Sequence, residues 1–322
     1  MPKKERVRIE QAYENWVNCL KGTDPNSIFQ QITLMIWDTA IFKIIVEGRK
    51  DQIQKNPQNP EINGSLHSFI DRNYFQTQCM FIRRLADNSY GLTGDRGVYS
   101  LGALINDIKS YRAEFTRAAY LEFRNLPYDK TERLKKRNDF FGSHPPGIAF
   151  HVPSDLNVFS IDEAHQFFDR LSNTSPENRR KEDQISENVF SRLREKLDIC
   201  EGIARYVDKF IAHSATPESQ TSLDEAMSKI TYKRLWEAHQ ILFEVADFLS
   251  VVLFSVSHMA LAFEHPTFFD YWGTPIVGVN DFETIHATLE KYRKETEEWS
   301  SNGFKNVWDW IEKKQPDEID NE

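Results

Sequence analysis

The stretch SENVFSRLREKLDICEGIARYVDKFIAH, residues 186–213, decides the fold. Its apolar residues return every three or four positions, which is the spacing of one buried face on an α-helix. This stripe consists of Val189, Leu193, Leu197, Cys200, Ala204, Val207 and Ile211. A second long apolar segment, 231–263, follows after a loop of under 20 residues. Two such helices joined by so short a loop are expected to pack as antiparallel neighbours.

Most of the remaining chain has the same helical period. We expect helices from residue 28 to the proline cluster at 56–60, from 64 to 87, and from 100 to about 125 with a break near Arg112. Strand patterns are scarce, and the best is 276–279. The predicted fold class is therefore all-α, a multi-helix bundle with an irregular insertion and a helical C-terminal extension.

The period fails after residue 126, where prolines and a basic run interrupt it. We interpret this region as an irregular insertion that contains one short helix, started by a capping box of Ser160 and Glu163, and then a solvated linker over 172–184. The expected organisation is N-terminal helices at 1–125, the insertion at 126–184, a core helix pair at 185–265, and a helical extension with an acidic tail at 266–322.

Composition narrows the classes of function. The chain has 322 residues and a formal charge of −9, which argues against a protein that coats nucleic acid but leaves a local basic site open. Three widely spaced cysteines without a C-x-x-C motif predict neither a disulfide framework nor a zinc site, and a cytoplasmic location is expected. The uncharged run 248–263 has 16 residues, fewer than the roughly 20 that span a bilayer, so we expect a core helix and no membrane.

A cationic ridge stands out on the 186–213 helix. Arg205, Lys209 and His213 are four residues apart and fall within an arc of about 80°, nearly opposite the apolar stripe. Tyr206 and Phe210 lie beside them as an aromatic strip, which suggests a second packing partner, either the insertion or another copy of the chain.

Two interpretations of this ridge are open. It can be a solvated face whose terminal histidine complements the helix dipole. It can also be a phosphate site, because a histidine moves a proton near neutral pH and an arginine stabilises a developing phosphorane oxyanion. Upstream, Arg83 and Arg84 either form a surface ion pair with Asp87 or face the ridge and contact an RNA backbone.

The segment YVDKFIAHS at 206–214, followed by Tyr232-x-x-Leu235-Trp236, resembles the HEPN superfamily (higher eukaryotes and prokaryotes nucleotide-binding). More narrowly, it is similar to the AbiU-type abortive-infection branch, in which an Asp-Lys pair, here Asp208 and Lys209, precedes Ala-His at the end of one helix. The resemblance covers about 28–112 and 186–256.

The resemblance implies a homodimeric helical bundle that cleaves RNA without a metal ion. In that family an arginine and a histidine, with about four to six residues between them, meet their copies across the two-fold axis. His213 would be the general base, Arg205 would stabilise the phosphorane, Lys209 would position the backbone, and Arg83, Arg84 and Asp208 would bind the substrate. The chain departs from the pattern, since seven residues separate Arg205 from His213.

The predicted function is thus a metal-independent endoribonuclease of a prokaryotic defence or toxin system. The alternatives are a catalytically silent HEPN-like module that binds RNA, a nucleotide or a partner protein, and a purely structural helical protein. Expected partners are RNA, a second copy of the chain, and an antitoxin or other defence-system protein. No cofactor is expected and no metal, because the histidines at 144, 151, 258 and 265 lack clustered carboxylates.

Overall fold

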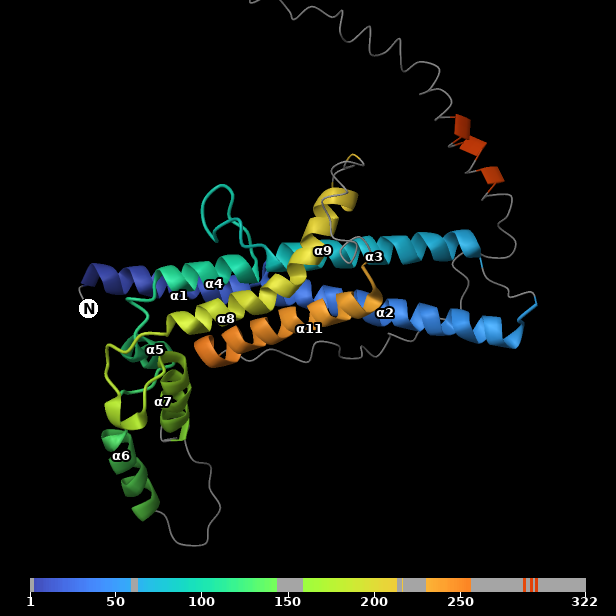
Figure 1. Ribbon diagram of the computed structural model, residues 1–322. Coiled ribbons are helices and arrows are strands. Elements are labelled where there is room, and N and C mark those ends of the chain that lie inside the picture. Colours follow the sequence, from blue (N-terminus) through green and yellow to red (C-terminus); the bar gives the residue numbers. More distant parts are fainter. Residues whose placement is uncertain are drawn as a thin grey trace, which may run out of the picture. The chain divides into compact units, whose positions relative to one another are not determined.

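The computed structural model describes residues 3–58, 63–143, 159–212, 216, 230–255, 286–287, 290–291 and 293–294. The regular elements of these residues are all helices (Figure 1), which confirms the all-α prediction. The chain divides into two compact units, Met1–Phe263 and Glu264–Glu322. The candidate strand at 276–279 and most of the helical extension lie outside the described residues.

The first five helices have clear local causes. They are α1 (Lys3–Lys21), α2 (Ile28–Lys55), α3 (Gly64–Ala86), α4 (Leu101–Ser110) and α5 (Arg117–Phe123). Helix α2 ends just before Pro57, as predicted. The next three begin at Asn63, Ser100 and Thr116, whose side-chain oxygens accept a hydrogen bond from a backbone N–H of the first turn. The predicted break near Arg112 is confirmed by the gap between α4 and α5.

The two segments that decided the fold pack against each other. The first comprises α8 (Glu187–Leu197), η3 (Asp198–Cys200), α9 (Glu201–Tyr206) and η4 (Val207–Ile211), and the second comprises α11 (Tyr232–Phe248) and η5 (Leu249–Phe254). Helices α8 and α11 are in contact and run in opposite directions (Figure 1). The Nζ atom of Lys196 lies 2.5 Å from a carboxylate oxygen of Glu244. Leu193, Leu197 and Val207 are buried, which confirms the prediction of antiparallel neighbours.

The prediction of one continuous α-helix over 186–213 was wrong in detail. Its hydrogen bonding changes to a 3-10 turn in η3 and to a π-helical turn in η4, where Ala212 N–H donates to the Val207 carbonyl oxygen five residues back at 2.7 Å. The 231–263 segment likewise ends its helix at Phe254, because Ser255 has a left-handed backbone with φ of 54°. Residues 256–263 lie outside the described part of the chain.

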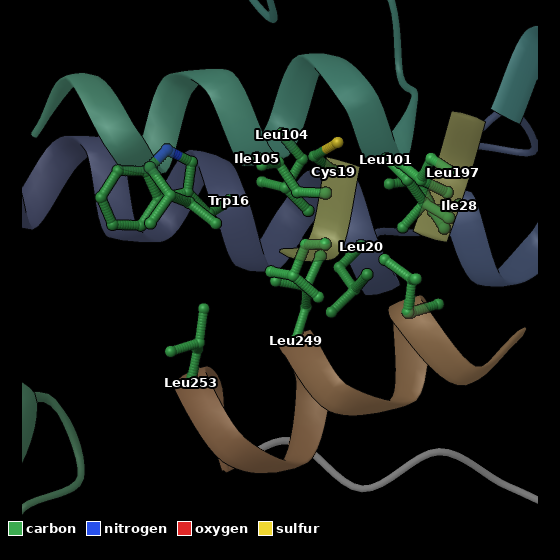
Figure 2. Close-up of a cluster of buried hydrophobic side chains, with 14 of the residues drawn as sticks. Trp16, Cys19, Leu20, Ile28, Leu101, Leu104, Ile105, Leu197, Leu249 and Leu253 are labelled. Atoms are coloured by element: carbon green, nitrogen blue, oxygen red, sulfur yellow. The ribbon is translucent and has the colours of Figure 1, made fainter. Parts of the chain in front are cut away.

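Part of the core lies between α1, α4, α8 and η5 (Figure 2), and the same buried cluster continues into α2, α3, α5, α7 (Phe159–Ser172) and α11. Trp16 is fully buried there, and its indole N–H donates to the carboxylate of Asp107 at 2.7 Å. Leu101, Leu104 and Leu249 belong to the same cluster, and Leu101 lies near Ile28 and Leu197. All three cysteines, Cys19, Cys79 and Cys200, are buried and none forms a disulfide.

The insertion has more regular structure than the sequence predicted. It contains α6 (Thr131–Gly142), α7 (Phe159–Ser172) and the short 3-10 turn η2 (Pro176–Asn178). Helix α7 begins before Ser160, so the expected capping box does not start it. Basic residues that read as an irregular run lie on α6, where straight-chain Lys and Arg are good helix formers. Residues 144–158 lie outside the described part.

The expected solvated linker over 172–184 is mostly exposed, as predicted, but two of its side chains anchor it to the bundle. The backbone carbonyl of Asp183 accepts a hydrogen bond from Arg117 N–H at 2.9 Å, and its carboxylate lies 2.9 Å from the Arg117 guanidinium. Arg117 is fully buried and forms a second ion pair with Asp169 of α7 at 2.8 Å. Arg179 from the same linker pairs with Asp169 as well. A buried ionic network therefore joins α5, α7 and the linker.

Among the described helices, α2 alone has the length and apolarity to cross a membrane. It contacts α1, α3 and α11, and it buries Ile32 and Met35 completely. The core helix of a soluble protein passes the same test of length and composition.

Candidate functional site

A cleft of about 270 Å³ lies between the end of α3, the start of α4 and the α8–α9 segment. Its lining includes one arginine from each of three helices and several carboxylates. The arginines are Arg83, Arg194 and Arg205, and the carboxylates are Asp87, Asp198, Glu201 and Asp208. We call it the arginine cleft.

The described part of the cationic ridge lies beside this cleft. Arg205 is exposed, and its Nε–H donates to Glu201 Oε1, one helical turn back, at 3.0 Å. Lys209 is half-buried and is not part of the cleft lining. His213 lies outside the described residues, one position beyond Ala212. The structure therefore places Arg205 in the cleft and leaves the histidine unplaced.

Arg83 and Asp208 connect α3 with η4. The Nε atom of Arg83 lies 2.6 Å from Asp208 Oδ1, and the two side chains are 35% and 45% exposed. At this exposure an ion pair contributes little to stability, on the order of 0–1 kcal/mol. The alternative of a surface pair between Arg83 and Asp87 is wrong, because the described partner of Arg83 is Asp208.

Arg84 faces a neighbouring cleft of about 590 Å³, which Arg83 also lines. Its Nη2 donates to Asn26 Oδ1 at 3.2 Å. Arg84 is therefore not in the arginine cleft, and of the predicted substrate-binding residues only Arg83 and Asp208 share it with Arg205.

The aromatic strip beside the ridge is covered by α3. Tyr206 meets Phe75 edge to face, with ring centroids 6.0 Å apart, and lies 4.9 Å from the ring of Phe210. The expectation that Tyr206 needs the insertion or another copy of the chain was therefore wrong, because α3 already packs on it. Phe210 stays 37% exposed and is the part of the strip that still offers an apolar contact.

The charges of the cleft are nearly balanced, with three arginines and four carboxylates in its lining. A phosphate that entered would have to displace carboxylates from Arg83 or Arg205 rather than meet free cations. In the described part of the chain, no group of three or more His, Cys, Asp or Glu side chains is placed to hold a metal ion. The cleft thus suits a ligand that competes for arginine with carboxylates, which phosphate does through bidentate contacts.

Two residues of the cleft were missed from the sequence. Arg194 precedes Arg205 by 11 residues, which is close to three helical turns, so both lie on one face. Glu201 precedes Arg205 by four residues, the spacing of a helical ion pair. Both signals were present in the spacing alone, whereas the approach of Arg83 required the packing of α3.

Comparison of the chain with protein-family models, curated proteins and solved structures found no match. Fold and cleft together define an all-helical bundle with an arginine-lined cleft beside a π-helical turn.

Proposed function

We propose that the chain is an RNA-directed, HEPN-like protein of a prokaryotic defence system that cleaves RNA without a metal ion. The observation that carries the proposal is the π-helical turn Val207–Ile211, which begins two residues after Arg205. Such turns are rare in proteins and occur frequently at functional sites.

The π turn bears on the spacing that departs from the family pattern. In an unbroken α-helix, residues eight positions apart differ by about 80° in direction. A π turn holds one residue more than an α turn, so the offset between Arg205 and the eighth position after it falls to about 20°. Seven intervening residues then count as six, which is within the spacing that the resemblance implies. We therefore expect Arg205 and His213 to share one face.

The chemistry follows from these groups. His213 takes the proton of a ribose 2′-hydroxyl, and the 2′ oxygen attacks the adjacent phosphorus. The bond from phosphorus to the 5′ oxygen breaks, which leaves a 2′,3′-cyclic phosphate and a 5′-hydroxyl that takes up a proton. Arg205, or the copy of it in a second subunit, stabilises the phosphorane, while Lys209 positions the backbone. Arg83 and Arg84, in the last turn of α3, contact further phosphates of the RNA strand. Phe210, exposed beside Arg205, provides an apolar contact for the homodimer.

A specific observation favours a second candidate, a catalytically silent module that binds RNA or a partner protein such as an antitoxin. Both cleft arginines that the proposed function uses already form ion pairs with carboxylates. Arg205 pairs with Glu201, and Arg83 pairs with Asp208. An arginine held in this way can bind a strand without being placed to stabilise its transition state.

Expression in a bacterial host separates the two candidates. We expect wild-type chain to arrest growth and degrade RNA, and His213→Ala to do neither at equal protein level. Arg205→Lys should impair cleavage, because an ammonium cannot reproduce a bidentate contact. Arg192→Lys is the matched control, since Arg192 forms a similar exposed pair with Glu195 on α8.

Purified protein completes the test. Cleavage should persist in EDTA, and light scattering should give a dimer at micromolar concentration. Activity that survives His213→Ala, or that disappears in EDTA and returns with magnesium, would contradict the proposed chemistry. RNA binding without cleavage by wild type would favour the silent module.

A further inference from the structure

A second site lies on the other side of α3, in a groove of about 610 Å³ between α2, α3 and α11. Three aromatic rings from these three helices stack there. Phe42 and Tyr74 are parallel within 3°, with centroids 3.8 Å apart, and the ring of Tyr232 lies 5.7 Å from Phe42 at 24°. The Tyr74 hydroxyl bonds to Thr39 Oγ1 at 3.1 Å, which fixes its ring. The groove therefore has a rigid, flat aromatic wall.

Two aromatic side chains of the groove are exposed to solvent. Tyr232 is 55% exposed and Trp236 is 54% exposed, although both are large aromatic side chains of a core helix. The Nζ atom of Lys43 lies 4.1 Å from the centre of the Trp236 ring. This contact holds a cation over one face of an exposed aromatic ring.

The groove has a positive excess in a protein whose formal charge is −9. Four cationic side chains and two carboxylates line it. Arg49 holds Asp71 through two bonds of 2.8 Å, and Lys50 holds Glu47 at 2.6 Å. The other two cations have no such close carboxylate partner among the described residues. Lys43 lies against the Trp236 ring, and the nearest described carboxylate to Lys233 is 3.8 Å away.

The floor of the groove contains a polar atom with an unmade hydrogen bond. His239 is 94% buried, lines the groove, and its Nε2 has no hydrogen-bond partner among the described residues. A buried polar atom left without a partner is costly, so native structures rarely keep one that no ligand or water satisfies.

We propose that this groove binds a nucleotide, whose base stacks on the Trp236 and Tyr232 rings and reaches His239, and whose phosphate pairs with Lys43 and Lys233. Flat rings suit a base, which stacks regardless of its identity, and the adjacent lysines suit its phosphate. A purely apolar ligand would bury both lysines without a counter-charge. The site shares no lining residue with the arginine cleft, so it does not rest on the proposed function.

Calorimetric titration of the full chain tests the proposal, with AMP and UMP as probes. Adenosine, which lacks the phosphate, and ribose 5-phosphate, which lacks the base, should each bind at least tenfold more weakly than AMP. Trp236→Ala should weaken AMP binding by roughly 5- to 100-fold, the range found for loss of one base-stacking ring. Phe141→Ala is the matched control, because Phe141 is also an exposed ring under a cation, Arg137, and lies on α6.

The role of His239 has its own readout. His239→Leu should weaken AMP binding while leaving the Tm equal or higher, because it removes the unpartnered atom. His239→Gln, which restores a polar group at a similar reach, should recover part of the affinity. A merely structural histidine would instead show a lower Tm in His239→Leu and unchanged binding.

A 12-nucleotide single-stranded RNA distinguishes the two sources of a nucleotide. If the site takes one unit of a strand, this RNA should bind at least tenfold more tightly than AMP and should lose affinity in Trp236→Ala. If the site takes a free nucleotide, AMP should bind as tightly as the RNA, and Trp236→Ala should affect AMP alone. Absence of binding by AMP, UMP and the RNA at 1 mM, or binding unchanged in Trp236→Ala, overturns the proposal whether or not the chain cleaves RNA.

Discussion

At the scale of single residues, the buried imidazole of His239 determines how one part of the core responds to acid. Burial, together with the nearby charge of Lys43, lowers the pKa of His239 to about 4 from an ordinary value of 6.5. In the unfolded chain the same side chain takes up a proton at the ordinary value. The unfolded state therefore binds more protons than the folded state between these two values, and stability falls as the pH falls through this window.

We expect His239→Leu to remove this dependence. Wild type should lose on the order of 3 kcal/mol more unfolding free energy than the variant when the pH falls from 7.5 to 4. Urea unfolding at several pH values measures the difference, and the subtraction cancels the other titrating groups. Parallel pH profiles for the two proteins would show that His239 is protonated in the folded state.

The sequence predicted the positions of some residues of the two sites better than those of others. The four-residue spacing predicted that Arg205 is exposed opposite the apolar stripe, and it is. The helical period places His239 on the buried face of α11 with Leu235 and Leu242, but it does not show that α2 packs beside it. Likewise, the stack of Phe42, Tyr74 and Tyr232 joins three helices, and a helical period describes one helix at a time.

At the scale of elements, the close approach of α4 to the end of α3 depends on a glycine. A Cβ atom built on Gly102 would lie 2.4 Å from the backbone carbonyl oxygen of Asp87. The same junction is held by Ser100, whose hydroxyl donates to that oxygen at 2.6 Å. No side chain larger than hydrogen fits there unless the two helices separate.

Gly102→Ala should therefore destabilise the chain by about 1–3 kcal/mol, as overpacking does in well-packed cores. Gly48→Ala is the opposite control, because Gly48 lies within α2 with open space around its Cβ direction. It should stabilise by about 0.5–1 kcal/mol through the better helix propensity of alanine. Thermal unfolding of both variants checks the pair, and equal shifts in Tm would contradict the steric explanation.

The helical period predicted where elements lie better than it predicted their hydrogen bonding. The stripe from Val189 to Ile211 does form one helical path, yet that path passes through 3-10, α and π turns. These forms differ in which carbonyl an N–H selects, while the spacing of apolar residues stays between three and four. Helix α3 packs against η4, and that contact joins residues far apart in the sequence.

At the scale of the whole molecule, one buried arginine fastens the insertion to the bundle. Arg117 of α5 meets Asp169 of α7 and Asp183 of the following segment, and its guanidinium lies 4.9 Å from the centre of the Phe168 ring. The polar composition of 172–184 predicted its exposure, but composition does not reveal that Asp183 pairs with an arginine 66 residues earlier in the chain. Hydrogen bonds from Arg179 and Arg117 outweigh the opposing effect of burial and hold the pKa of Asp169 below its ordinary value.

Arg117→Met should cost about 3–5 kcal/mol, because it leaves the largely buried carboxylate of Asp183 without its cationic partner and leaves Asp169 with Arg179 alone. The loss should shrink in acid, since the contribution of Asp169 is present above its ordinary pKa and is lost as the pH falls through its lower folded value. Chemical denaturation at pH 7 and pH 3 measures this. Arg192→Met, at an exposed site, is the control and should change stability by less than about 0.5 kcal/mol.

The three buried cysteines can report the local opening of the helices that contain them. They lie on α1, α3 and η3, and burial raises the pKa of each thiol to about 12. A thiol that is neither accessible nor ionised does not react with an alkylating reagent, so each modification has to wait until its own helix opens. Mass spectrometry of the three labelled peptides then gives three separate rates of modification, and the order of these rates is the order in which the parts of the bundle open.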